Sequence, residues 1–200
     1  MKLAIAMLVL ALPASVFAVD GVVLINQSTV TAAGGFPYSI SQPGSYKLSG
    51  NLVVPSGVNG IQITASNVTL DLNGFSITNL GNNGSLIFFL VKTVGAVAGF
   101  RVRNGTILAN GTVPIDASTA SGTVAEDLTL IQAGGGGQSF FGSWAILRRV
   151  LFPSPGGGES AGVISITCPA VVVDSLAGIF VRNTNTSTAC TFGNSSGVVE

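Results

Sequence analysis

Three charged residues recur at nearly constant intervals and are the best candidates for chemistry in this chain. The interval from Asp127 to Arg149 is almost as long as the one from Arg149 to Asp174. If each interval is one turn of a coil, neighbouring members stack about 4.8 Å apart, so each carboxylate lies beside the arginine and the two carboxylates stand roughly 10 Å apart. The set therefore predicts one short line of alternating charge.

Two chemistries would suit such a line of charges. In a lyase the carboxylates would hold a metal ion and Arg149 would act as the base. In an inverting hydrolase the two carboxylates would stand about 6.5–9.5 Å apart. The third interpretation is an ionic ladder that only stabilises the fold. The sequence favours the ladder, because an arginine between two acids neutralises them and fills the gap that a substrate needs.

Two further groups of residues could bind a ligand without transforming it. Arg101 and Arg103 alternate along one segment, so on a strand they share a face and could form a small patch for anionic sugars. Trp144 lies near Phe140 and Phe141 beside a glycine-rich loop, and these rings could stack on sugars. Core packing is the commoner role of such rings, and solvating a sheet is the commoner role of two arginines.

The composition excludes several classes of function. Eight basic and eight acidic residues among 200 give a formal charge of zero, and no basic patch of the kind that binds nucleic acids is visible. Histidine is absent, which removes the commonest general base and the commonest ligand of transition metals. The acids are scattered along the sequence, so we expect no metal and no other cofactor. Only the lyase alternative would need Ca²⁺.

Residues 1–18 have the pattern of a signal peptide. Lys2 supplies the positive start, residues 3–12 are apolar, and small residues precede a cleavage site after Ala18. About ten apolar residues are too few to cross a bilayer. A second apolar run, Leu86–Phe100, contains a lysine and two glycines and reads as buried strand with a turn. We therefore expect a secreted or cell-surface protein with no membrane span after cleavage.

Export makes the two cysteines a candidate disulfide. Cys168 and Cys190 would face an oxidising compartment. They are as far apart in the sequence as Asp127 and Arg149, which would place them on neighbouring coils, at a spacing that suits a disulfide. Two buried free thiols are the alternative.

Short strands repeated along the chain are expected to hold these residues in place. The segment Val68–Ile77 reads as a strand, an Asn-Gly corner and a second strand, and weaker copies follow it. The first interval between copies is about 31 residues and the later ones are about 22–25 residues, a period typical of a solenoid. At about 3.3 Å per residue, one of the later intervals traces roughly 70 Å, which suits one three-sided coil. The intervals are counted between the corner residues Asn73, Asn104, Asp127, Arg149 and Asp174.

These intervals favour a parallel β-helix over the other folds built from short strands. A leucine-rich horseshoe would show regular leucines and helical return segments, and a β-sandwich would not require copies at constant intervals. No segment after the signal peptide has the apolar periodicity of a helix. Residues 19–43 are expected to cap the stack, and residues 44–200 to form the β-helix domain. The C-terminal coil needs a cap as well, so it could mediate an oligomer.

The first interval and the Asn73 copy depart from the regular repeat. The long first interval predicts an insertion around residues 80–85. The register of the Asn73 copy is ambiguous by one residue, because Leu70 and Leu72 flank it differently from Val102 in the next copy.

Three segments resemble exported bacterial proteins of the pectin-lyase-like superfamily: Gly44–Leu52, Asn67–Ile77 and Val102–Ile107. The resemblance covers most of the mature chain and is strongest over residues 44–130. It implies an all-β, right-handed parallel β-helix, here of about five to seven coils. The superfamily includes polysaccharide lyases, polygalacturonases, pectin esterases and non-catalytic adhesins. The polygalacturonase pattern requires paired aspartates and a Gly-His-Gly segment, which this chain lacks.

The function favoured by these observations is a secreted, non-catalytic structural or binding module with extracellular polysaccharide as its partner. The alternative is a divergent polysaccharide lyase or hydrolase of the same superfamily. The two differ in whether the charged line around Arg149 is a ladder or an active site.

Overall fold

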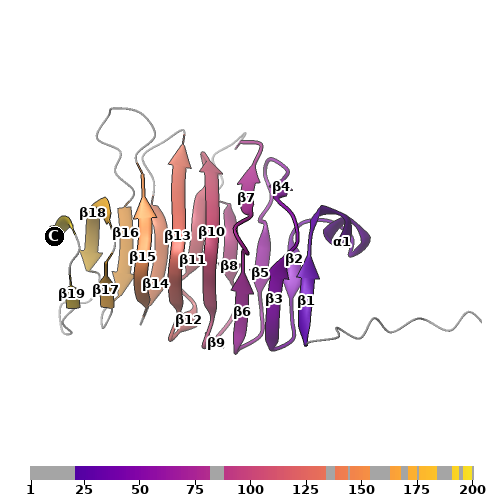
Figure 1. The fold of residues 1–200 in the computed structure, drawn as a ribbon, viewed down its shortest axis with the longest axis horizontal. Helices are drawn as coiled ribbons and strands as arrows, with labels where there is room; N and C mark the ends of the chain where they lie inside the picture. The colour runs from indigo at the N-terminus through magenta and orange to yellow at the C-terminus, as the bar shows by residue number, and fades with distance from the viewer. Residues whose placement is uncertain are drawn as a thin grey trace, which may run out of the picture.

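The chain winds into a parallel β-solenoid of about five turns (Figure 1). The computed structural model describes residues 21–81, 88–133, 138–143, 145–153, 163–167, 171–174, 176–183, 191–193 and 196–199. Neighbouring coils pair in parallel along the whole stack. The all-β class and the parallel β-helix predicted from the repeat are therefore confirmed.

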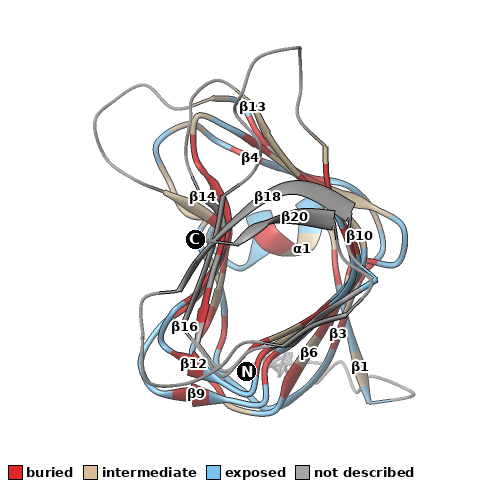
Figure 2. Ribbon diagram, turned by 90° about the vertical axis from the view of Figure 1, so that its left-hand side faces the viewer, coloured by how far each residue is buried: buried red, intermediate tan, exposed pale blue. Residues whose placement is uncertain are grey.

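Three rows of strands form the sides of each coil, which Figure 2 shows end-on. The first face contains β1 (Val22–Ile25), β3 (Gly44–Leu48), β6 (Val68–Asp71), the first halves of β10 (Arg101–Asn110) and β13 (Val124–Ala133), β15 (Ile146–Phe152), β17 (Val171–Val173) and β19 (Thr191–Gly193).

The second face continues from the first around a corner. It contains β4 (Leu52–Val54), β7 (Ser76–Asn79), the second halves of β10 and β13, the end of β15 and the start of β18 (Leu176–Asn183).

The third face closes the coil. It contains β2 (Tyr38–Ile40), β5 (Ile61–Ile63), β8 (Phe89–Thr93), β11 (Val113–Ala117), β14 (Gln138–Ser143), β16 (Val163–Thr167), the end of β18 and part of β20 (Ser196–Val199). Two short strands, β9 (Val97–Ala98) and β12 (Ala120–Ser121), pair at the turn that leads back to the first face.

From the Asn73 coil onward, the corner between the first and second faces carries a left-handed residue with a side chain, which glycine follows in the Asn73 coil. The positive φ angles lie between 50° and 66° at Asn73, Asn104, Asp127, Arg149 and Asp174. These are the five corner positions that the repeat predicted. A single left-handed residue turns the backbone sharply while the strands on both sides stay paired to the next coil. Asn and Asp tolerate this conformation better than other residues with side chains, which explains four of the five residue types.

The ambiguous register at Asn73 has a structural cause. Before the corner, Asp71 pairs with Arg103, whereas after it Ser76 pairs with Thr106. The segment 72–75 lies between these paired positions in the Asn73 coil, but only 104–105 lies between them in the next. The Asn73 coil therefore carries two extra residues at its corner. Most of the rest of the long interval lies between β7 and β8, where residues 82–87 are outside the described residues.

A helix lies across the N-terminal end of the stack, where no helix was predicted (Figures 1 and 2). α1 (Gln27–Ala32) has only six residues, which is too short to show apolar periodicity in the sequence. A local capping box starts it: the Asn26 side chain accepts from the Thr29 N–H at 3.0 Å, and the Thr29 hydroxyl accepts from the Asn26 N–H at 2.8 Å. Val30 points into the core and is fully buried.

The solenoid begins before residue 44. β1 pairs in register with β3 and β2 with β5, so both strands of the segment 19–43 already belong to the stack. Inward-facing side chains alternate with outward-facing ones and fill the interior; Phe100 and Phe140 are the largest that are fully buried. In the second apolar run, Leu90 and Val91 are buried in β8, as expected. No helix among the described residues is long and apolar enough to cross a membrane.

Candidate functional site: a charged strip beside the corner

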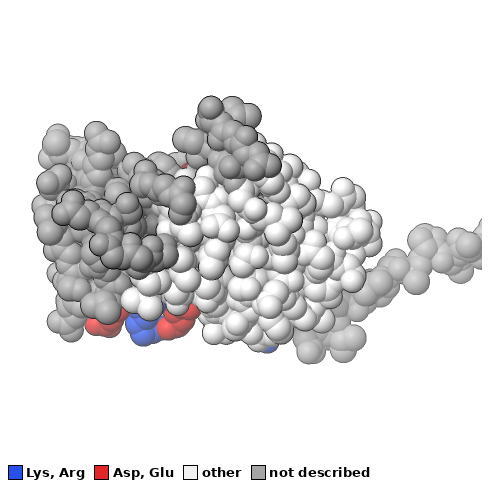
Figure 3. All heavy atoms as spheres, turned by 90° about the horizontal axis from the view of Figure 1, so that it is seen from above, with Lys and Arg blue, Asp and Glu red and all other residues white. Residues whose placement is uncertain are grey.

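The corner brings two of the three predicted charged residues into direct contact. Arg149 donates from Nε to Asp127 Oδ1 at 2.5 Å and from one terminal nitrogen to Asp127 Oδ2 at 2.7 Å. This two-bond geometry is the strongest form of an arginine–carboxylate pair. Asp174 occupies the same corner position one coil further and is exposed. In Figure 3 acidic and basic side chains alternate along the lower margin of the stack.

The pair shifts the acidity of both partners. The hydrogen bonds from Arg149 lower the pKa of Asp127, and the arginines nearby add to this effect. The pKa of Arg149 is raised, first by the hydrogen bond to Asp127 and then by the negative charges of Asp127, Glu126 and Asp174. Asp127 is thus held ionised and Arg149 is held protonated.

A second line of charges runs parallel to the corner on the outer side of the first face. The strand register places Asp71 opposite Arg103, Arg103 opposite Glu126, and Glu126 opposite Arg148. Acid and base therefore alternate over four coils. Together with the corner residues these side chains form one feature, which we call the charged strip: Asp71, Arg101, Arg103, Glu126, Asp127, Arg148, Arg149 and Asp174.

The carboxylates on this face are engaged and mostly covered. Asp71 lies 3.1 Å from the Arg103 guanidinium and also accepts from the Asn104 side chain at 3.2 Å and from the Asn73 N–H at 2.8 Å. Glu126 lies 2.9 Å from Arg101 and 4.0 Å from Arg148. The side chains of Asp71 and Glu126 are only 16% and 10% exposed, so the arginines shield them from solvent.

Arg101 and Arg103 point to the same side of β10, as alternation predicted, but neither is a free cation. Both are exposed, with the buried Val102 between them. Arg101 bonds to Glu126 and Arg103 to Asp71. An anionic sugar would have to compete with these carboxylates for each guanidinium.

The remaining predicted site residues lie outside the described residues. These residues are Trp144, Cys168 and Cys190. Stacking of the tryptophan on sugars and pairing of the two cysteines therefore stay predictions. Among the residues that the structure does describe, no cluster of three His, Cys, Asp or Glu side chains could hold a metal ion.

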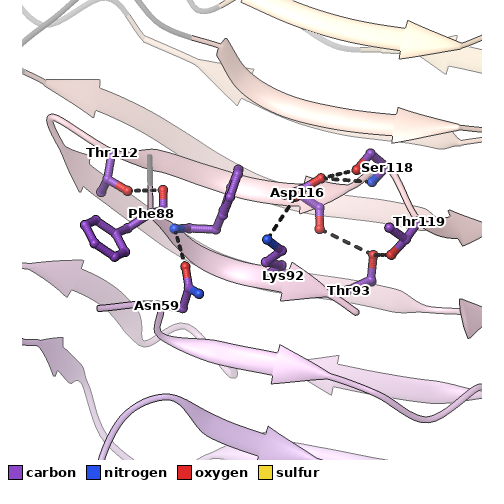
Figure 4. Close-up of polar contacts among 9 residues, drawn as sticks. Asn59, Phe88, Lys92, Thr93, Thr112, Asp116, Ser118 and Thr119 are labelled. Atoms are coloured by element: carbon purple, nitrogen blue, oxygen red, sulfur yellow. Dashed lines mark hydrogen bonds and ion pairs between the residues drawn. The ribbon is translucent and has the colours of Figure 1, made fainter. Parts of the chain in front are cut away.

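A second polar cluster on the third face was not predicted from the sequence (Figure 4). Asp116 on β11 is buried and accepts from the Ser118 N–H at 3.0 Å and the Ser118 hydroxyl at 2.6 Å. Lys92 on β8 lies 4.0 Å from the other Asp116 oxygen and 4.6 Å from the centre of the Phe89 ring. Thr93 and Thr119 share a hydrogen bond of 2.9 Å. The carboxylate thus fastens the end of β11, which is a structural role.

The alternation of Asp71, Arg103, Glu126 and Arg148 was not predicted, because these charged residues look scattered along the chain. A usable signal did exist: the last three stand immediately before a corner residue, and Asp71 stands two before one. The repeat that located the corner also locates this line.

No protein-family model, curated protein or solved structure matches this chain. The likeness to the pectin-lyase-like superfamily therefore rests on the quoted segments and on the parallel solenoid alone.

Proposed function

We propose that this protein is an exported, non-catalytic structural and binding module whose partner is an extracellular polysaccharide. The observation that supports a non-catalytic role is the two-bond contact between Arg149 and Asp127. It joins the candidate base to a candidate acid and leaves the arginine side chain occupied.

The direction of both pKa shifts also argues against catalysis at the corner. A general base works best when its pKa lies near the working pH, and the pKa of Arg149 is raised away from that range. The general acid of an inverting hydrolase needs a raised pKa, whereas that of Asp127 is lowered. Arg149 is therefore not tuned to be the base of a lyase, and Asp127 is not tuned to be the general acid of a hydrolase.

Assays of the purified mature protein test this proposal. We expect no release of reducing ends and no unsaturated, ultraviolet-absorbing products from acidic or neutral polysaccharides, with Ca²⁺ or with a chelator. We expect saturable binding to at least one polysaccharide in the same set. Calcium-dependent product formation that disappears in Arg149→Ala would instead establish the lyase.

We further propose the export features that this role requires, namely cleavage after Ala18 and a disulfide between Cys168 and Cys190. Intact mass and N-terminal sequencing of the secreted protein check the cleavage site. Alkylation with and without a reductant checks the disulfide: two thiols should be modified only after reduction. Modification of two thiols without reductant would show that the cysteines are free.

A further inference from the structure

The second face differs from the first because its outward side chains carry no charge in the described residues. Two straight rows run along it. The hydroxyl row consists of Ser76, Thr106 and Thr129, which are direct neighbours in the strand register. The aliphatic row lies two residues further along each strand. It consists of Val53, Leu108 and Ile131, with Thr78 between the first two.

The parallel register gives these rows a regular spacing. Neighbours within a row are about 4.8 Å apart, and the two rows lie about 7 Å apart, because side chains on one side of a strand are two residues apart. In the coils of β10 and β13 the face presents a hydroxyl group beside an aliphatic group, at Thr106 and Leu108 and again at Thr129 and Ile131. In the coil of β7 both positions carry hydroxyls, Ser76 and Thr78.

The groups of these rows are available to a ligand. Ser76, Thr106 and Thr129 are half-buried, and their hydroxyls form no hydrogen bond with any described residue. Val53 of the aliphatic row is 42% exposed. Leu151 on β15, which pairs with Thr129 and ends the hydroxyl row, is 39% exposed. On the charged strip, in contrast, the arginines are already bound to carboxylates. In Figure 3 most of the described surface is uncharged and the acidic and basic side chains lie mainly at one margin.

We infer that the second face is the binding surface, and that it takes an extended chain of uncharged polysaccharide lying along the stack. A neutral sugar chain has hydroxyl groups at the edges of its rings and C–H groups on their faces, so it can meet both rows at once. Its repeating units can follow the parallel rows, which have the same hydroxyl and aliphatic pair in the coils of β10 and β13. An acidic polysaccharide gains nothing here, since no cation lies on the described part of this face. The inference rests on the binding role proposed above and specifies its ligand.

Binding of the whole mature protein to a set of neutral and acidic polysaccharides tests the inference. The probes are the neutral polymers cellulose, chitin and mannan and the acidic polymers polygalacturonate and alginate, each at about 0.05 M and 0.5 M NaCl, where ionic attraction to acidic chains is strongly screened at the higher salt. We expect saturable binding to a neutral polymer that changes less than about twofold with salt, since it involves no ion pairs.

Two double variants locate the surface. Thr106→Glu with Thr129→Lys places opposite charges on directly paired residues, which keeps the sheet compatible with folding, and should weaken binding at least tenfold. Thr106→Val with Thr129→Val keeps the branched shape but removes both hydroxyls, and should weaken binding as well. Arg101→Gln with Arg103→Gln on the charged strip is the matched control and should bind like the parent. Circular dichroism verifies that each variant is folded.

The remaining outcomes separate the two proposals. Salt-sensitive binding to acidic polymers only, lost with Arg101→Gln and Arg103→Gln, would overturn the inference and keep the binding role. Binding to a neutral polymer that survives both threonine double variants would also overturn it. Absence of binding to all five polymers would overturn the inference and the proposed function together.

Discussion

Arg149 is the residue at which local and long-range preferences conflict. Its φ of 51° lies in the left-handed region, where a long side chain is disfavoured and where the other corners have Asn or Asp. The compensation is its contact with Asp127, but the two side chains are 50% and 46% exposed, and exposed ion pairs contribute little to stability. Backbone strain and ion pairing therefore oppose each other at one position.

Substituting Arg149 separates these two effects. Arg149→Asn removes the ion pair but suits the left-handed backbone, so we expect an unchanged or slightly higher Tm. Arg149→Ala removes the ion pair and keeps the unfavourable conformation, so we expect a Tm a few degrees below that of Arg149→Asn. Thermal unfolding followed by circular dichroism measures the order. If Arg149→Asn were the less stable of the two, the conformational argument would fail.

The lowered pKa of Asp127 predicts that the stability of the fold depends on pH. Its pKa is lowered in the folded protein by Arg149, so the pair stabilises the fold above about pH 4, the pKa range of an unfolded aspartate, and the contribution is lost as pH falls through the folded pKa. Asp127→Asn fits the corner but cannot ionise. The small stability difference between the parent and this variant should therefore shrink between about pH 6 and pH 3 in denaturant titrations. A difference that stays constant over this range would contradict the prediction.

At the scale of elements, the two-residue excess at the Asn73 corner is accommodated by a glycine in the next coil. A Cβ on Gly105 would lie 2.5 Å from the Leu72 Cβ and 2.6 Å from the Phe75 carbonyl oxygen. Leu72 is fully buried and cannot move aside. The wider corner of one coil thus fits only because the following coil has no side chain at this point.

Gly105→Ala should for this reason destabilise the protein by overpacking. We expect a loss of about 1–3 kcal/mol in the free energy of unfolding, seen as a lower denaturant midpoint. Gly50→Ala is the matched control, because its Cβ would meet only the Asn26 Cβ at 3.8 Å, an ordinary contact. Equal midpoints for the two variants would show that the corner can relax.

At the scale of the whole molecule, stability depends on contacts between neighbouring coils. In a solenoid each coil packs only against the coils before and after it. β10 pairs with strands on both sides along its length, whereas in the described part of the chain β1 pairs only with β3. The stack should therefore be most stable in its middle.

Hydrogen exchange can measure this gradient. We expect the backbone amides of β6, β10 and β13 to exchange most slowly and those of β1 to exchange much faster, because an end coil can open without breaking two interfaces. Mass spectrometry of peptic fragments resolves these segments. Equal protection of β1 and β10 would mean that the stack unfolds as one unit.

Much of this fold could be predicted because corners restrict residue type. Asn73, Asn104, Asp127 and Asp174 are residues that tolerate left-handed backbone, and their spacing sets the length of each coil. α1 was missed because its six residues, fewer than two turns, give no readable period. The line from Asp71 to Arg148 was missed because opposite charges on different coils are far apart in the sequence.

The repeat, the corner positions and the class of fold follow from the sequence, since they depend on local conformation and on alternation along each strand. Which charges meet, and which face is uncharged, follows from the packing of the coils. Those properties depend on the offset between paired strands of neighbouring coils, which changes across the Asn73 corner. The sequence favoured an ionic ladder around Arg149 over a catalytic base, and in the structure Arg149 is the partner of Asp127.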